Sequence, residues 1–84
     1  MDYIELLGLA AGTITSITFI PQVIRIWKTK SAKDISIPML LLLLLGTGMW
    51  LAYGIILRNT AIIYTNSMVT AMGLLMLYFK FRFK

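Results

Sequence analysis

The stretch ISIPMLLLLLLGTGMWLAYGIIL, residues 35 to 57, holds no charged side chain over 23 residues and is bounded by Asp34 and Arg58. The hydrocarbon core of a bilayer is about 30 Å thick, and roughly 20 helical residues cross it. Backbone groups in lipid have no water to bond, so a segment that crosses the core must be a helix. The stretch therefore predicts one membrane-spanning helix.

Two further uncharged runs flank this stretch, with 19 residues between Glu5 and Arg25 and 21 between Arg58 and Lys80. The chain has 84 residues, of which 60% are hydrophobic and 13% charged, and its mean hydropathy is +0.88. A soluble domain of this length cannot bury so much apolar surface in one core. We predict one all-α domain over residues 1–84, a membrane bundle whose three transmembrane helices span about 4–27, 38–57 and 61–79.

Lysine and arginine are unevenly distributed between the predicted connections. The first loop holds four and the C-terminal tail three, whereas the second connection holds only Arg58 and the N-terminus carries Asp2 and Glu5. Cytoplasmic loops carry an excess of these basic residues. We therefore expect the first loop and the C-terminus to be cytoplasmic and the N-terminus to be outside. This topology explains the net charge of +5. A nucleic-acid partner would need a basic face on a soluble fold, and we expect none.

The chain lacks the residues that most catalytic and metal sites require. It contains no cysteine and no histidine, and its three acids all lie at predicted helix ends. Disulfides and most zinc or haem sites are thereby excluded, and we expect no metal, no cofactor and no enzyme. A proton-coupled carrier normally needs a titratable group within the membrane. The predicted spans have none, so any transport should follow the gradient of the solute itself.

The first predicted helix carries small and hydroxylated residues that a lipid-facing helix does not need. Gly8, Gly12 and Ser16 recur every four residues, a stripe that allows two helices to approach closely. Further hydroxyl groups belong to Thr13, Thr15 and Thr18. We interpret the stripe as a packing surface and the hydroxyls as groups that bond their own backbone.

Pro21 and Gln22 interrupt the same helix near its predicted cytoplasmic end. Proline has no N–H to bond the carbonyl of Ile17 and its ring clashes with that group, so the helix bends or loosens there. We expect Ser16 and Thr18 to help satisfy the freed groups, as hydroxyls do in membrane helices. The helix taken alone leaves two interpretations open, a static kink and a hinge.

Two unusual residues lie at one depth in the other two predicted helices. Trp50 is eight residues before Arg58, and Asn66 is eight after it. At about 1.5 Å per residue both lie roughly 12 Å below the outer boundary. Tryptophan prefers the interface and asparagine is costly in lipid, which indicates a shared polar cavity. An aromatic ring and an amide together suit a sugar. The alternative is an interhelical hydrogen bond in a packed bundle.

These motifs together resemble a known family. The pair Pro21–Gln22, followed by TKSAKDIS, WLAYGI and YTN at this spacing, is similar to the bacterial SemiSWEET sugar transporters of the PQ-loop (MtN3/saliva) superfamily. The resemblance covers essentially the whole chain. It implies a bundle whose third helix packs between the first two. It also implies a parallel homodimer on a two-fold axis along the membrane normal. Three helices cannot enclose a sugar path alone, and a closed symmetric dimer is the simplest solution.

The resemblance also implies roles for individual residues. Residues matching Trp50 and Asn66 form the substrate pocket of the family, and the Pro21–Gln22 pair matches its hinge. The tyrosine matching Tyr53 helps to close the outer gate. The implied location is the inner membrane of a prokaryotic cell, and the implied partners are a sugar, the lipid bilayer and a second copy of the chain.

One position departs from the family pattern. Relatives often place an arginine and an aspartate near the outer gate, where they bridge the two subunits. An ungapped comparison puts Leu57 and Asn59 at those positions, with Arg58 shifted by one. We therefore expect no ion pair in this gate and closure through Tyr53 and neutral contacts.

The resulting hypothesis is a homodimeric sugar uniporter that works by alternating access. Within transport, the alternative is a PQ-loop carrier of another small polar solute such as an amino acid. The absence of a charged residue near Trp50 and Asn66 disfavours zwitterions. From a different class, the alternative is a non-transporting membrane scaffold or holin-like oligomer. That interpretation leaves the common depth of the two residues unexplained.

Overall fold

The computed structural model describes residues 3–83, which form four helices: α1 (Tyr3–Ile17), α2 (Ile20–Thr29), α3 (Ile37–Leu57) and α4 (Thr60–Phe83). Three segments are long and apolar enough to cross a membrane, namely α1 together with α2, then α3, then α4. No strand occurs in the described part of the chain. The all-α class and the three spans predicted from the charge pattern are confirmed.

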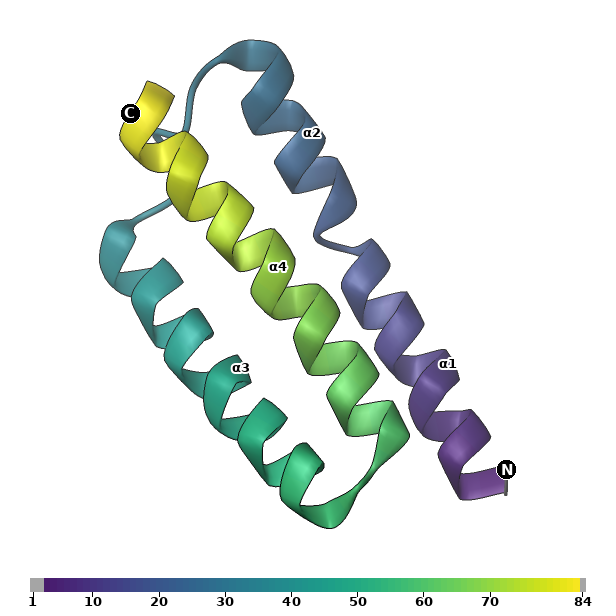
Figure 1. Cartoon of the computed structure of the whole chain (residues 1–84). Helices are drawn as coiled ribbons and strands as arrows, with labels where there is room; N and C mark the ends of the chain where they lie inside the picture. Colours follow the sequence, from purple (N-terminus) through teal and green to yellow (C-terminus); the bar gives the residue numbers. More distant parts are fainter. Residues whose placement is uncertain (1–2, 84) are drawn as a thin grey trace.

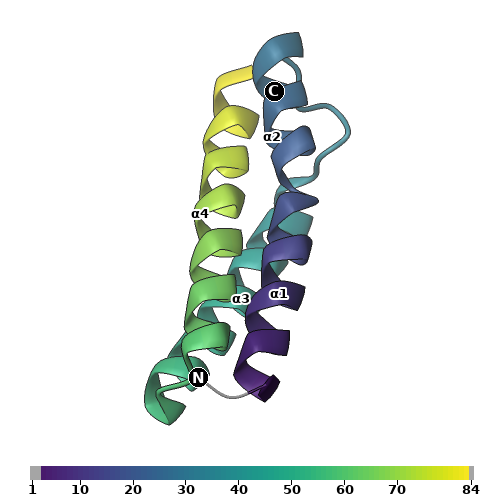
Figure 2. The same cartoon turned by 90° about the vertical axis from the view of Figure 1, so that its right-hand side faces the viewer.

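α4 lies between the other two spans (Figure 1). It contacts α1, α2 and α3, whereas α1 and α3 make no contact with each other within residues 3–83. Figure 2, seen from the side of α1 and α2, shows α4 beside them and α3 behind. The predicted order, with the third span between the first two, is therefore confirmed. The loop end is the end of the bundle that contains residues 30–36 and the C-terminal end of α4. The turn end is the opposite end, where residues 58–59 join α3 to α4.

The small-residue stripe of α1 faces α4. A methyl group added at Gly8 would lie 2.8 Å from the side chain of Ala61, and one added at Gly12 would overlap the side chain of Thr65. Gly12 and Ser16 are buried. Both glycines are needed because the two backbones approach too closely for a Cβ atom between them. The interpretation of the stripe as a packing surface is confirmed.

The first span is broken before the proline rather than bent at it. α1 ends at Ile17 and α2 begins at Ile20, which places Pro21 in the first turn of α2. Proline is tolerated there because the first N–H groups of a helix have no helical partner. The sequence predicted that the first helix bends or loosens because Pro21 cannot bond the carbonyl of Ile17, and the break over residues 18–19 confirms the loosening. The single helix expected over about 4–27 is divided in two there.

A tight turn satisfies the backbone at this break. Thr18 N donates to Thr15 O at 3.2 Å and Phe19 N to Ser16 O at 3.1 Å. The Thr18 hydroxyl also donates to Thr15 O, at 2.6 Å, so this side chain assists the break as expected. Ser16 does not, because its buried hydroxyl oxygen has no hydrogen-bond partner. The expectation that it bonds nearby backbone is wrong.

The ends of α3 and α4 carry the caps that their sequences provide. Ser36 Oγ accepts from Met39 N at 3.2 Å at the start of α3, and Asn59 Oδ1 accepts from Ile62 N at 3.1 Å at the start of α4. Each bond satisfies one of the free N–H groups of a helix N-terminus. α4 continues to Phe83, four residues beyond the predicted end at residue 79.

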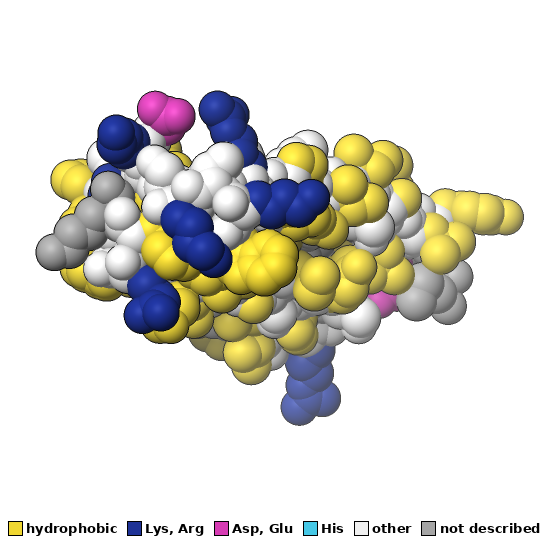
Figure 3. Space-filling view, turned by 90° about the horizontal axis from the view of Figure 1, so that it is seen from above, with side chains coloured by type: hydrophobic (Ala, Val, Ile, Leu, Met, Phe, Trp, Pro, Cys, Tyr) yellow, Lys and Arg dark blue, Asp and Glu magenta, His cyan; other side chains and the backbone are white. Residues whose placement is uncertain are grey.

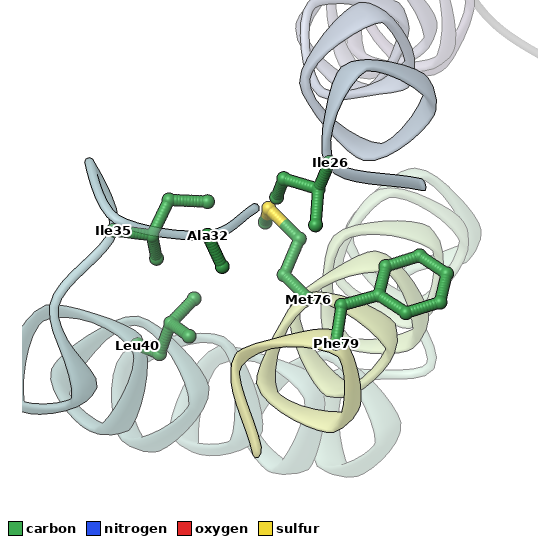
Figure 4. Close-up of a cluster of buried hydrophobic side chains, with 6 residues drawn as sticks. All are labelled: Ile26, Ala32, Ile35, Leu40, Met76 and Phe79. Carbon is green, nitrogen blue, oxygen red and sulfur yellow. The ribbon is translucent and has the colours of Figure 1, made fainter. Parts of the chain in front are cut away.

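A closed apolar cluster fills the loop end (Figure 4). Its buried side chains come from α2, the loop, α3 and α4, and they are Ile26, Ala32, Ile35, Leu40, Met76 and Phe79. The Lys80 ammonium donates to Ala32 O at 2.8 Å across the same region. This contact explains the extra turn of α4, because the loop gives the end of the helix a partner outside the apolar span.

The basic residues gather around the loop end (Figure 3). Lys30 Nζ lies 5.2 Å from the centre of the Phe83 ring and 5.5 Å from that of Trp27. Arg82 also lies over Phe83, at 5.9 Å. Such contacts suit a boundary between lipid and water, where cations rest on aromatic rings. The first loop and the C-terminal tail therefore share one end of the molecule, as the charge pattern requires.

Candidate functional site

An open groove of about 310 Å³ lies in the half of the bundle nearer the turn end. It is formed by α1, α3 and α4, because α1 and α3 lie on two sides of α4 without touching. Its lining residues are Gly8, Ala11, Gly12, Thr15, Trp50, Ala61, Ile62, Thr65 and Asn66. The two residues singled out by their common depth, Trp50 and Asn66, thus lie on the same groove.

Trp50 presents its ring to this groove from α3. The side chain is 56% exposed, so the protein covers only part of the indole. Tyr53 packs edge-on against it, with ring centres 5.5 Å apart and an angle of 88°. Tyr53 does not line the groove itself but a neighbouring cavity, which it shares with Met49 and Trp50. The two rings are thus nearly perpendicular, and the exposed part of the indole is available for stacking.

Asn66 does not bridge two helices. Its Nδ2 donates to Ile62 O at 3.0 Å, within α4. The hydrogen bond that joins α3 and α4 runs instead from Thr70 Oγ1 to Thr47 Oγ1, at 2.9 Å. The alternative role of Asn66 as an interhelical hydrogen bond is thus wrong. An amide has two N–H donors and a carbonyl with two lone pairs, so one donor and the oxygen remain for a ligand.

Two threonines complete the polar lining, and the sequence reasoning missed their place in it. Thr15 lies on the same face of α1 as Gly8 and Gly12, and Thr65 precedes Asn66 on α4. Their hydroxyls bond no protein group in the described chain. The expectation that Thr15 bonds its own backbone is therefore wrong. The spacing could have predicted that Thr15 lies beside the α4 contact, because Thr15 is three residues after Gly12 and such residues share a helix face.

Pro21 and Gln22 lie apart from the groove. Gln22 lines a cavity of about 330 Å³ at the loop end, together with Arg25, Ile26, Ser31, Ala32, Asp34, Ile35 and Met39. Pro21 is exposed in the first turn of α2. The structure thus separates the residues of the groove from those of the helix break. Gln22 therefore belongs to a cavity at the loop end and not to the groove in the other half of the bundle.

At the turn end, the residues expected to leave the outer gate without an ion pair are Leu57, Arg58 and Asn59. Asn59 is used to cap α4, and Arg58 closes α3 in the left-handed conformation with φ of 56°. Arg58 N donates to Ile55 O at 3.1 Å. Both residues thus end or begin a helix, and Leu57 is 54% exposed. This arrangement agrees with the expectation of a gate without an ion pair, which stays a prediction.

The sequence pattern described as "PQ loop repeat" matches residues 3–63. This chain belongs to the PQ-loop family. The match contains α1, α2 and α3, including the Pro21–Gln22 pair. The resemblance expected from the motifs is confirmed.

Two curated PQ-loop relatives are each named "Sugar transporter SemiSWEET". The protein of Bradyrhizobium diazoefficiens is 39% identical over 80 residues, covering 93% of this chain and 93% of the relative. The protein of Leptospira biflexa is 36% identical over 76 residues, covering 90% of this chain and 89% of the relative. The chain therefore spans nearly the full length of these relatives.

A solved structure shares the whole PQ-loop fold. The "bacterial homologue of SWEET transporters" superposes with a TM-score of 0.93 at 34% identity, covering 99% of this chain and 100% of the other. The packing of α4 between the first and second spans is thus the architecture of a known transporter homologue. This similarity supports the fold over the complete chain, beyond the 3–63 range of the family pattern.

Proposed function

We propose that this chain is a facilitative sugar transporter of the PQ-loop family. The observation that carries the proposal is the placement of Trp50 and Asn66 on one groove from different helices. An indole covers the C–H face of a sugar ring, and an amide bonds its hydroxyls in both directions. The names of the two relatives, each a sugar transporter, support the same solute class. The chain would act as one domain over residues 1–84.

The proposed unit is a parallel homodimer. The groove of one chain is open on one side, and Asn66 would be costly if that side faced lipid. A second copy placed by a two-fold axis along the membrane normal covers both grooves at once and makes one central cavity. Each chain then supplies one Trp50 and one Asn66. The exposed Met49 and Tyr53 flank the same opening.

We place the dimer in a cell inner membrane with the loop end in the cytoplasm and the N-terminus outside. The basic residues around the loop end support this orientation through the positive-inside rule (Figure 3). The groove then opens toward the outer half of the membrane, with Tyr53 beside it as part of the outer gate. Because Leu57 and Asn59 are neutral, the gate closes without an ion pair.

Transport is proposed to follow the gradient of the sugar alone. No Asp, Glu, Lys, Arg or His lies within the uncharged runs of the three spans, so no mobile charge couples uptake to protons or to the membrane potential. Uptake into vesicles should therefore persist when a protonophore removes the proton gradient. Uptake that collapses under this treatment, with no other energy-dependent step present, would contradict the uniporter.

Pro21 and Gln22 are proposed as the hinge of alternating access. The break at residues 18–19 has fewer helical bonds than its surroundings, and Pro21 cannot supply one. Rotation about this break would move α2 and open or close the cytoplasmic end. Spin labels on the loop ends of the two α2 helices should report two distances in the native dimer. In Pro21→Ala the dimer should persist, one distance should dominate and uptake should be severely slowed.

The test of the function is uptake of radiolabelled monosaccharides and disaccharides by the pure protein in liposomes. Trp50→Ala and Asn66→Ala should each abolish uptake while the dimer still forms. The matched control is Trp27→Ala, because Trp27 is 55% exposed, close to the 56% of Trp50, and lies outside the groove. Uptake of amino acids but not sugars would favour the other solute class. Absence of uptake of either class, with the dimer intact, would favour a scaffold.

A further inference from the structure

The threonines of the helices fall into two groups by the partners of their hydroxyls. Thr13 donates to Leu9 O at 2.7 Å and Thr29 to Arg25 O at 2.7 Å, the usual bond to the preceding turn. Thr18, Thr47 and Thr70 also have partners in α1, α3 and α4. Thr15 and Thr65, which line the groove, have none in the described chain, and neither does Thr60, which is exposed at the start of α4 outside the groove.

The unused hydroxyls are not sealed inside the protein. Among residues 3–83, Ser16 Oγ is the one fully buried side-chain oxygen or nitrogen without a partner, so the oxygen of Thr65 is accessible. Thr15 is exposed on the groove face of α1. The Thr65 hydroxyl oxygen is the atom nearest to a methyl group added at Gly12, so it lies where α4 meets α1 at the edge of the groove. The groove is thus lined by one threonine from α1 and one from α4, and neither hydroxyl has a protein partner in the described chain.

We propose that Thr15 and Thr65 are specificity-determining residues that bond hydroxyl groups of the sugar, an inference that rests on the proposed function. Each threonine hydroxyl donates one hydrogen bond and accepts others. With Trp50 on α3 and Asn66 on α4, they surround a ligand with one stacking face and three polar groups per chain. The site therefore selects a ligand that carries hydroxyls on several sides, and it disfavours analogues that lack them.

The test compares four variants with the native protein in liposomes, using radiolabelled glucose and radiolabelled sucrose as probes. Thr15→Val and Thr65→Val keep the shape of the side chain and remove the hydroxyl. Thr15→Ser and Thr65→Ser keep the hydroxyl and remove the methyl group. A lost hydrogen bond should raise the half-saturating concentration of the better probe about 3- to 10-fold with little change in maximal rate. The serine variants should return toward the native value.

The control is Thr13→Val, because the Thr13 hydroxyl donates to Leu9 O and also lies 3.2 Å from the Tyr64 hydroxyl on α4, and Thr13 does not line the groove. It should leave the half-saturating concentration unchanged. Mono-deoxyglucose competitors add a second measurement. The analogue that lacks the bonded hydroxyl should inhibit uptake by the valine variant and by the native protein with the same inhibition constant, because it cannot form the bond in either protein.

The outcomes separate this inference from the function on which it rests. Native uptake together with unchanged affinity in both valine variants overturns the inference alone. An equal loss in Thr13→Val, or no recovery in the serine variants, overturns it as well, since the effect would then be one of packing. If the native protein takes up neither probe nor any other sugar, the proposed function fails and the inference fails with it.

Discussion

The loop end and the turn end of the molecule are packed in different ways. At the loop end, large side chains from α2, α3 and α4 fill the space between the helices, and Lys80 bonds the loop. At the turn end, Gly8 and Gly12 bring α1 directly against α4, and an open groove with polar side chains remains beside this contact. Small residues thus allow one part of the bundle to be tight without filling the space that a ligand needs.

The break at residues 18–19 lies between these two regions. α1 packs on α4 through small residues, whereas α2 contributes Ile26 to the apolar cluster with the loop. The two segments of the first span are therefore held by separate sets of contacts. The comparison predicts that substitutions at the loop end change stability through lost apolar packing, and that substitutions at the turn end act through the approach of two backbones.

The largest expected effect on stability is at the loop end. Leu40 is fully buried in the apolar cluster, and Leu40→Ala should lower the free energy of unfolding in detergent by about 2–5 kcal/mol, because the cavity is enclosed on all sides. Leu42→Ala is the control, since Leu42 is 70% exposed on the same helix, and it should change stability by less than about 0.5 kcal/mol. Equal losses in both variants would show that the cluster is not a closed core.

At the turn end, a single methyl group should be harmful. Gly12→Ala places a Cβ atom where the Thr65 side chain lies, so α1 must move away from α4, at a cost of about 1–3 kcal/mol. Gly48→Ala is the matched control, because nothing lies within 4 Å of a Cβ atom built there. That variant should be neutral or more stable by up to about 1 kcal/mol. Thermal unfolding of both proteins measures the difference, and a neutral Gly12→Ala would refute the close approach.

The smallest expected effect concerns the link between α4 and the loop. Lys80→Met removes the bond to Ala32 O and should lower stability by about 1 kcal/mol, with faster amide hydrogen exchange in residues 30–36. Arg82→Met provides the control, since Arg82 is exposed and rests on Phe83. If the exchange of the loop is the same in both variants, the link does not hold the loop end together.

Sequence reasoning found those features that depend on the solvent around each span. The three runs without charge follow from the cost of charge in lipid. The first corresponds to α1 and α2 together, the second to α3 and the third to α4. The common depth of Trp50 and Asn66 also follows from counting residues along two antiparallel helices, and both residues line one groove. Such features need no knowledge of which helix faces touch.

Features that depend on contacts between helices were missed. The hydroxyl of Thr65 belongs to the groove because Gly12 brings α1 against it, and neither residue reveals this alone. The break at residues 18–19 lies in the turn before Pro21, where the sequence predicted a bend or a loosening, but the restart of the helix at Ile20 was not predicted. The extra turn of α4 depends on Lys80 meeting the loop, a partner distant in sequence.

The central claim, that a sugar binds against Trp50 beside Asn66, has a direct spectroscopic test. The chain has two tryptophans, Trp27 and Trp50, so Trp27→Phe leaves Trp50 as the single indole reporter. Titration of this protein with a transported sugar should change the Trp50 fluorescence in a saturable manner, because the ring becomes covered by the sugar. Adding Asn66→Ala should weaken or abolish the saturation. Trp50 emission that stays constant at sugar concentrations that saturate uptake by the same protein would contradict the claim.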